Sequence, residues 1–156
     1  MNGINRCNMD TPIGNLVIEE NGEAIVALHI APRQENTCET PLLLETKRQL
    51  REYFAGKRRE FALPVALNGT EFRRKVWEVL RTIPYGETRS YGEVAAAVGN
   101  PKASRAVGGA NHNNPVMIIV PCHRVIGADG SLTGFGGGLS AKEYLLSLER
   151  KYCDKL

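Results

Sequence analysis

The stretch IIVPCHRVIG at positions 118–127 places a thiol, an imidazole and a guanidinium side by side in Cys122, His123 and Arg124. The apolar run before Pro121 predicts a buried strand, so that Cys122 stands at its exit and can face a pocket. A lone cysteine after such a run usually belongs to the core, because free cysteine packs as a small hydrophobic side chain. The adjacent histidine and the glycine-rich segment that follows favour a reactive thiol instead.

A carboxylate that could serve this pair lies in the last predicted helix. Glu149 follows Leu145 by four residues and adjoins Leu148, so it points partly inward from an apolar face. Most such glutamates extend to water, but a buried carboxylate needs a partner, and His123 is the one available. Because neighbouring side chains of an extended segment point to opposite sides, we expect a bridging water between Cys122 and His123. With Glu149 fixing the imidazole tautomer, such a relay generates a thiolate.

The segment GADGSLTGFGGGL at 127–139 holds six glycines in thirteen positions. It lacks the G-K-[ST] ending of a phosphate-binding loop. A lid, or a wall that offers bare backbone amides, is favoured, and a plain surface loop is the alternative.

Two short predicted helices precede the reactive stretch. Ser90 and Glu93 begin the first with a capping box, and Gly99 ends it. Asn100 and Pro101 restart the chain as cap and first helical residue, with helix to about residue 111. The pair has the shape of a helix-turn-helix, although packed helix pairs that bind no DNA share this pattern.

The second of these helices is unusual for a reader of bases. It carries one arginine, Arg105, among alanine, glycine and serine. Gly108 and Gly109 destabilise a helix interior, so they indicate that a partner comes very close.

The first half of the chain predicts a supporting α/β unit. An Asn-Gly turn joins two strand-like runs, 15–20 and 23–30, into a hairpin. Thr40 and Pro41 begin a helix that closes at Gly56, and the run 59–67 predicts one further strand. The second half is mainly helical, with a helix from Thr70 and a final helix that opens with a second capping box, Ser140 and Glu143. The expected fold class is therefore α+β: an N-terminal antiparallel sheet plus helix over 1–68, and a helical domain with a helix-turn-helix over 69–156.

Composition sets the remaining bounds. Hydrophobic residues make up 42% and charged residues 24% of the 156, as in ordinary globular proteins. No apolar run has the length of a membrane span or signal peptide, so we expect an intracellular protein. The cysteines at 7, 38, 122 and 153 are scattered, which disfavours disulfides and zinc. Residues 70–156 carry 12 Lys/Arg against 8 Asp/Glu, which suits a nucleic-acid partner.

These motifs together resemble one family. PCHRV at 121–125 is similar to the active-site signature of the O6-alkylguanine-DNA alkyltransferases, also called methylated-DNA–protein-cysteine methyltransferases. The resemblance continues through FRRKVWEVLRTIPYGETRSYGEVAAAVGNPKASRAVGGANHNNP and GGLSAKEYLLSLE, over about residues 69–150. The first 69 residues resemble the family only in layout, as its variable N-terminal domain. Some relatives carry zinc there, but only Cys7 lies near a ligand position, so no metal is expected.

The resemblance implies specific roles. Cys122 would accept the alkyl group, with His123 and Glu149 as its relay and Asn114 supporting the active-site turn. Tyr91 would donate a hydrogen bond to the flipped base and contact the phosphate at which it flips.

Other residues would hold DNA and base. Arg105 would enter the duplex and fill the space that the flipped nucleotide leaves. The remaining expected DNA contacts are Ser104, Ala106, Gly108, Gly109, Ala110 and Arg124, with the small residues pressed into the minor groove. The base pocket would be lined by Val125, Phe135, Gly136 and Gly137, with Phe135 as an aromatic wall and an amide near Gly136 facing O6. The stretch at Asn111 and His112 varies among relatives and bears on pocket width.

The implied function is direct repair: one irreversible transfer of an alkyl group from O6-alkylguanine, and also O4-alkylthymine, in double-stranded DNA to Cys122. No cofactor is needed, and a monomer in the cytoplasm, nucleoid or nucleus is expected. The alternatives are a non-catalytic lesion sensor or DNA-binding regulator, and a thiol hydrolase.

Overall fold

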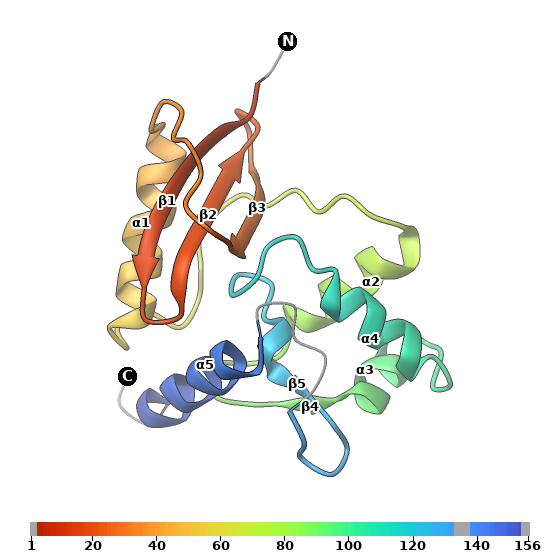
Figure 1. The fold of residues 1–156 in the computed structure, drawn as a ribbon. Helices are drawn as coiled ribbons and strands as arrows, with labels where there is room; N and C mark the ends of the chain where they lie inside the picture. The colour runs from red at the N-terminus through yellow and green to blue at the C-terminus, as the bar shows by residue number, and fades with distance from the viewer. Residues whose placement is uncertain (1–2, 133–137, 154–156) are drawn as a thin grey trace. The chain divides into compact units, whose positions relative to one another are not determined.

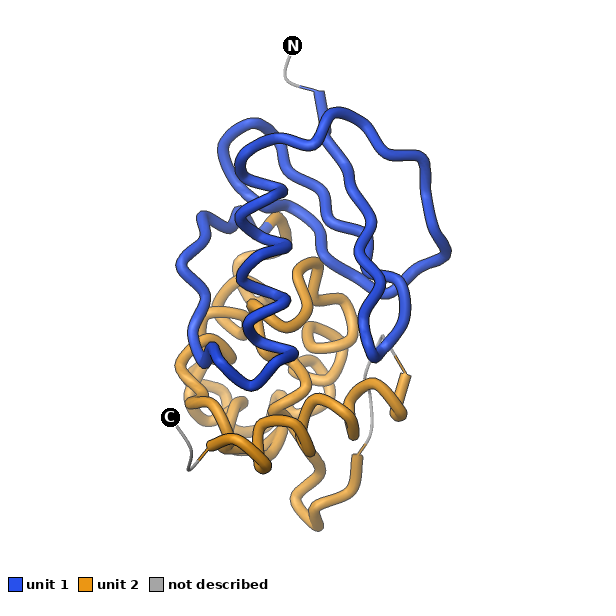
Figure 2. The backbone as a smooth tube through the Cα atoms, turned by 90° about the vertical axis from the view of Figure 1, so that its left-hand side faces the viewer, with its two compact units in different colours: residues 1–67 blue, residues 68–156 orange. Residues whose placement is uncertain are grey.

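The computed structural model describes residues 3–132 and 138–153. The chain divides into two compact units, residues 1–67 and 68–156, against an expected boundary between residues 68 and 69 (Figure 2). Among the described residues, no helix is long and apolar enough to cross a membrane. The expected α+β class is confirmed, with a small antiparallel sheet in the first unit and mostly helix in the second.

The first unit is an antiparallel sheet with one helix packed on it (Figure 1). The strands β1 (Asn5–Thr11), β2 (Gly14–Glu20) and β3 (Ile25–Ile30) pair in chain order. Strand β1 was not predicted, because its run NRCNMDT alternates polar residues with only two apolar ones. Helix α1 (Pro41–Phe54) begins as predicted, with the Thr40 hydroxyl accepting a hydrogen bond from the Leu43 amide.

The strand expected over 59–67 does not form. Only Val65 makes a β-bridge, to Ile25, with hydrogen bonds from the Ile25 amide to the Pro64 carbonyl and from the Ala66 amide to the Ile25 carbonyl. Proline has no amide hydrogen to donate, so the ladder is not extended at that position.

The second unit contains the helices α2 (Glu71–Leu80), α3 (Tyr91–Ala97), α4 (Ser104–His112) and α5 (Leu139–Tyr152). Between α4 and α5 lies a single 3₁₀ turn, η1 (Cys122–Arg124). It leads into β5 (Val125–Ile126), which pairs in parallel with β4 (Arg89–Ser90) just before α3. This pairing brings the residues after Cys122 beside the start of the helix pair (Figure 1).

Two predicted features of the helix pair have different outcomes. The capping box of Ser90 and Glu93 is present at the start of α3, and Gly99 follows that helix with a φ of +87°. The start of α4 was predicted three residues too early, because residues 101–102 form a turn closed by the Ala103 amide on the Asn100 carbonyl. The helix therefore begins at Ser104 without a side-chain cap.

Two further expectations for this unit are wrong. The apolar run before Pro121 is a buried coiled loop, in which Ile118 has a φ of +70° and the Val120 amide bonds the Val116 carbonyl. Burial gives such a loop the composition of a strand, which periodicity alone cannot distinguish. The capping box at Ser140 is also absent, because α5 already begins at Leu139 and its cap position is Gly138.

Candidate active site

Cys122 is the first residue of η1 and is almost fully buried, with 3% of its surface exposed. Burial raises the pKa of its thiol to about 11, although the Asn114 side chain and the Lys142 charge lower it in part. The resting residue is therefore a thiol at neutral pH, and the reaction needs a base to remove its proton.

His123 supplies a neutral imidazole beside that thiol. Burial lowers its pKa, and the opposing effect of Glu149 does not reverse this. Its Nε2 lies 2.6 Å from Glu149 Oε2, and both side chains are buried. An ionised carboxylate only accepts hydrogen bonds, so Nε2 carries the hydrogen and Nδ1 holds the lone pair. Nδ1 is buried without a hydrogen-bond partner among the described residues, which leaves it available as a base.

The backbone at Cys122 and His123 differs from the extended segment on which the expected bridging water was based. Cys122 and His123 were expected in an extended segment with opposite side-chain directions, whereas they occupy consecutive positions of a 3₁₀ turn. The predicted pair of His123 and Glu149 is nevertheless present.

Glu149 is the centre of a larger network than the sequence suggested. Burial alone raises its pKa, but His123 and Arg124 outweigh this and lower the pKa far below its usual range. Arg124 donates from Nε to Oε1 at 2.8 Å and from Nη2 to Oε2 at 3.0 Å. The Gly86 amide donates to Oε1 at 3.1 Å. Four hydrogen bonds thus hold this carboxylate in its charged form.

Arg124 was expected to contact DNA, and the structure places it elsewhere. Its side chain is 8% exposed, and its Nη1 donates to the Ile83 carbonyl at 2.7 Å. The guanidinium also lies 5.7 Å from the centre of the Tyr85 ring. Because the guanidinium of Arg124 is buried and hydrogen-bonded to Glu149 and to the loop 83–86, it is not accessible to a DNA phosphate. The loop 83–86 therefore helps to support the site, through the Ile83 carbonyl and the Gly86 amide.

Two asparagines hold the backbone on either side of Cys122. Asn114 bridges its loop as expected, donating to the Val120 carbonyl at 2.8 Å and accepting from the Val116 amide at 3.0 Å. Asn111, which the sequence placed only in a variable stretch, donates from Nδ2 to the Cys122 carbonyl at 3.2 Å.

Lys142 is a buried cation that the sequence analysis missed. Its Nζ donates to the Val125 carbonyl and lies 6.0 Å from the centre of the Tyr91 ring. Its charge favours the thiolate form of Cys122. Lys142 precedes Glu149 by seven residues, two helical turns, so the shared face of α5 was a signal that could have revealed it.

The helix pair places the expected DNA residues unevenly. Arg105 and Ala106 are exposed on α4, and Ser104 and both glycines are partly exposed. Ala110 is fully buried, and its carbonyl accepts a hydrogen bond from Trp77 Nε1, so it belongs to the core and not to a DNA surface. A side chain built at Gly108 would come 3.9 Å from Tyr91, which places that ring beside α4.

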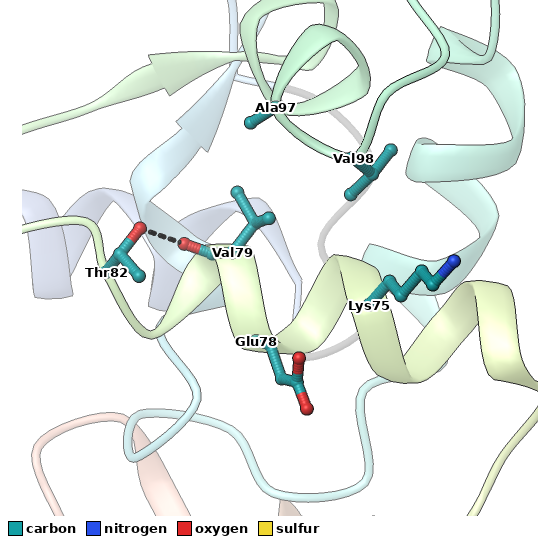
Figure 3. A pocket seen from close by; sticks show the side chains of 6 residues that line it. All are labelled: Lys75, Glu78, Val79, Thr82, Ala97 and Val98. Atoms are coloured by element: carbon teal, nitrogen blue, oxygen red, sulfur yellow. Dashed lines mark hydrogen bonds between the residues drawn. The ribbon is translucent and has the colours of Figure 1, made fainter.

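The base pocket is only partly visible. Val125 is fully buried next to η1, whereas Phe135, Gly136 and Gly137 lie outside the described residues. Among the residues described, no group of three side chains could hold a metal ion. A separate hollow of about 330 Å³ lies between α2 and α3, lined by Lys75, Glu78, Val79, Thr82, Ala97 and Val98 (Figure 3). No relay residue lines it.

Comparison with known proteins covers both units. Models of the 6-O-methylguanine DNA methyltransferase family match residues 7–67 with the ribonuclease-like domain and residues 71–151 with the DNA binding domain. The chain is 49% identical over 152 residues to the constitutive methylated-DNA–protein-cysteine methyltransferase of Bacillus subtilis, across 90% of this chain and 92% of that protein. It is 50% identical over 149 residues to the methylated-DNA–protein-cysteine methyltransferase of Mycobacterium leprae, across 92% of this chain and 90% of that protein.

Solved structures agree with these sequence matches. The Mycobacterium tuberculosis O6-methylguanine methyltransferase superposes with a TM-score of 0.89 and 44% identity, across 96% of this chain and 94% of that one. Mycobacterium tuberculosis OGT in complex with DNA gives a TM-score of 0.84 and 48% identity, across 93% and 92%. Because the matches span both units and include the segment that holds Cys122, His123 and Glu149, the chain belongs to the 6-O-methylguanine DNA methyltransferase family.

Proposed function

We propose that this protein repairs alkylated DNA by moving the alkyl group from O6 of guanine, and from O4 of thymine, to Cys122, once per molecule. The observation that carries the proposal is a buried thiol preceding a neutral histidine, which a fully hydrogen-bonded carboxylate orients. The proposed partner is double-stranded DNA, bound by a monomer in whichever compartment holds the DNA: the cytoplasm with its nucleoid, or the nucleus.

Helix α4 is the element proposed to enter the minor groove. A Cβ at Gly109 would meet no neighbouring atom of the described residues within 4 Å, so their packing does not require a glycine there. Glycine inside a helix costs about 1 kcal/mol relative to alanine. The cost is explained if a binding partner must approach the backbone of α4 closely at this position. The floor of the DNA minor groove is such a partner surface.

Burial of the nucleophile implies that the damaged nucleotide leaves the stack. With 3% of Cys122 exposed, its sulfur cannot reach an atom inside a duplex. Rotating the nucleotide out of the helix solves this, at a cost of a few kcal/mol for unstacking. Arg105, exposed on α4, would fill the vacated space in the duplex.

The proposed transfer begins with a proton. His123 Nδ1 makes no direct hydrogen bond to the thiol or to any other described residue, so it takes the thiol proton of Cys122 through a water. Glu149 stabilises the resulting imidazolium. The sulfur attacks the alkyl carbon in line, so that the S–C bond forms as the C–O6 bond breaks. Tyr91 gives its hydroxyl proton to the departing guanine and is then reprotonated at the expense of the imidazolium. The net result is an S-alkyl cysteine and an intact guanine, and the thioether has no leaving group that could regenerate the thiol.

The two alternatives predict other features. A lesion sensor would bind through the same helices with an inert thiol, and it leaves the relay of His123 and Glu149 without a use. A thiol hydrolase would turn over without DNA, and it leaves the open position at Gly109 unexplained.

Mass spectrometry tests the proposal. The protein is mixed with an equimolar duplex that contains one O6-methylguanine, and we expect a single added methyl on the peptide of Cys122, with no second turnover in excess DNA. The variant Cys122→Ala should bind the duplex and gain no mass. Binding by the unaltered protein without any gain in mass would leave the lesion sensor as the function.

A further inference from the structure

Asn111 links the proposed DNA-binding helix to the nucleophile. It lies in the last turn of α4 and is buried, with 1% of its surface exposed. Its Nδ2 donates to the Cys122 carbonyl at 3.2 Å. The same carbonyl accepts a second hydrogen bond from the Val125 amide, which closes η1. Two donors from different elements therefore fix the orientation of this one carbonyl.

The carbonyl belongs to the peptide group that joins Cys122 to His123. A peptide group is planar and trans, so its C=O and N–H point in opposite directions from one rigid plane. Holding the Cys122 oxygen thus also sets the direction of the His123 amide. That amide interacts with the Cys122 sulfur and lowers the pKa of its thiol against the effect of burial.

The other half of the Asn111 amide has no structural task. Its Oδ1 is buried without a hydrogen-bond partner among the described residues. A buried polar atom left unpaired is costly, and a leucine of similar size would fill the same space without that cost. The observation favours a residue kept for its donor at Cys122 and not for packing.

We propose that Asn111 is a positioning residue for the nucleophile, which transmits the placement of α4 to the peptide between Cys122 and His123. Gly108, one turn earlier on α4, lies next to the ring of Tyr91. The helix that is proposed to bind DNA thus contacts both Tyr91, the proposed proton donor, and the peptide of Cys122, the proposed alkyl acceptor. The inference rests on the proposed transfer and adds a residue to it.

The variant Asn111→Leu tests the inference, with Asn113→Leu as matched control. Asn113 lies two residues further on and is exposed, and among the described residues its side chain donates only to the Gly109 carbonyl of α4. Both variants lose one side-chain donor, but only the first one loses a contact with Cys122. Single-turnover methyl transfer is measured at saturating duplex between pH 6 and 9, together with the dissociation constant for DNA and the thermal unfolding midpoint.

We expect Asn111→Leu to transfer methyl about tenfold more slowly at pH 7, with a pH profile displaced to higher pH and DNA affinity within about twofold of the original. Asn113→Leu should match the unaltered protein. The charge of Lys142 also acts on Cys122, and neither His123 nor Lys142 is changed in either variant. If Asn111→Leu is unfolded at the assay temperature, Asn111→Ala must show the same slowing and displacement.

Equal rates and pH profiles in Asn111→Leu and Asn113→Leu would overturn the inference, as would a defect confined to DNA affinity. Failure of the unaltered protein to transfer methyl at all would instead contradict the proposed function, so the two failures are distinguishable.

Discussion

Glu149 serves structure and chemistry with the same two oxygen atoms. One oxygen receives His123 and Arg124, and the other receives Arg124 and the Gly86 amide. Removing one partner of a buried ion pair leaves an uncompensated charge, which commonly costs about 3–5 kcal/mol. The site is therefore most sensitive to substitutions that remove the charge of Glu149 or of Arg124.

Replacing Glu149 with glutamine should damage stability and transfer together. The variant Glu149→Gln keeps the shape of the side chain but leaves the buried Arg124 without a counter-ion, so we expect a loss of about 3 kcal/mol in the free energy of unfolding. The imidazolium also loses its stabilising charge, so methyl transfer should slow about 100-fold. Urea unfolding and single-turnover kinetics measure the two effects. The control Glu143→Gln, on the exposed face of the same helix, should leave both unchanged.

Helix α4 combines an internal and an external face within nine residues. Val107, Ala110 and Asn111 are buried, whereas Arg105 and Ala106 are exposed. Sequence periodicity could reveal the helix but not the assignment of Ala110, because small residues suit a tight protein core and a tight DNA contact equally. The Trp77 hydrogen bond to the Ala110 carbonyl distinguishes the two.

A substitution at Gly109 allows the effect on protein stability and the effect on DNA binding to be measured separately. The added methyl of Gly109→Ala meets no neighbouring atom within 4 Å in the part of the chain that the structure describes, so the variant should stabilise the fold by about 0.5–1 kcal/mol through helix propensity. The added methyl would stand between the helix and the groove floor, so the affinity for DNA should fall. Urea unfolding and a binding titration measure the two quantities. A variant that is more stable and binds as well as before would contradict the proposed position of α4.

At the scale of the whole molecule, the features that the sequence could predict are mainly those set by neighbouring residues. The caps at Thr40 and Ser90 were readable because a cap is set by neighbours within one turn. The pair of His123 and Glu149 was readable because a carboxylate on an apolar helix face needs a partner. The contacts of Arg124 with Ile83 and Glu149 were not readable, because an arginine beside the reactive stretch suits a DNA phosphate as well as a buried carboxylate.

The same buried charges make the molecule sensitive to acid. The folded-state pKa values of His123 and Glu149 both lie below their ordinary values. Below about pH 6.5 the unfolded chain binds a proton at His123 that the folded chain refuses, and below about pH 4.5 the same holds for Glu149. The free energy of unfolding should therefore fall as pH falls through these values. Urea unfolding at pH 7.5, 5.5 and 4 measures the decline, and Glu149→Gln should reduce the decline below pH 4.5 by the contribution of this one carboxyl. Constant stability across this range would contradict both depressed pKa values.

The position of Glu149 along the chain has a consequence for biosynthesis. Its partners His123 and Gly86 precede it by 26 and 63 residues, and it lies on the last helix to emerge during translation among those described. A nascent chain that already displays α3 and α4 still lacks the carboxylate that orients His123. Such a chain could hold DNA before its thiol has a working base. Since each molecule reacts once, late docking of α5 would keep the single reaction for the finished protein.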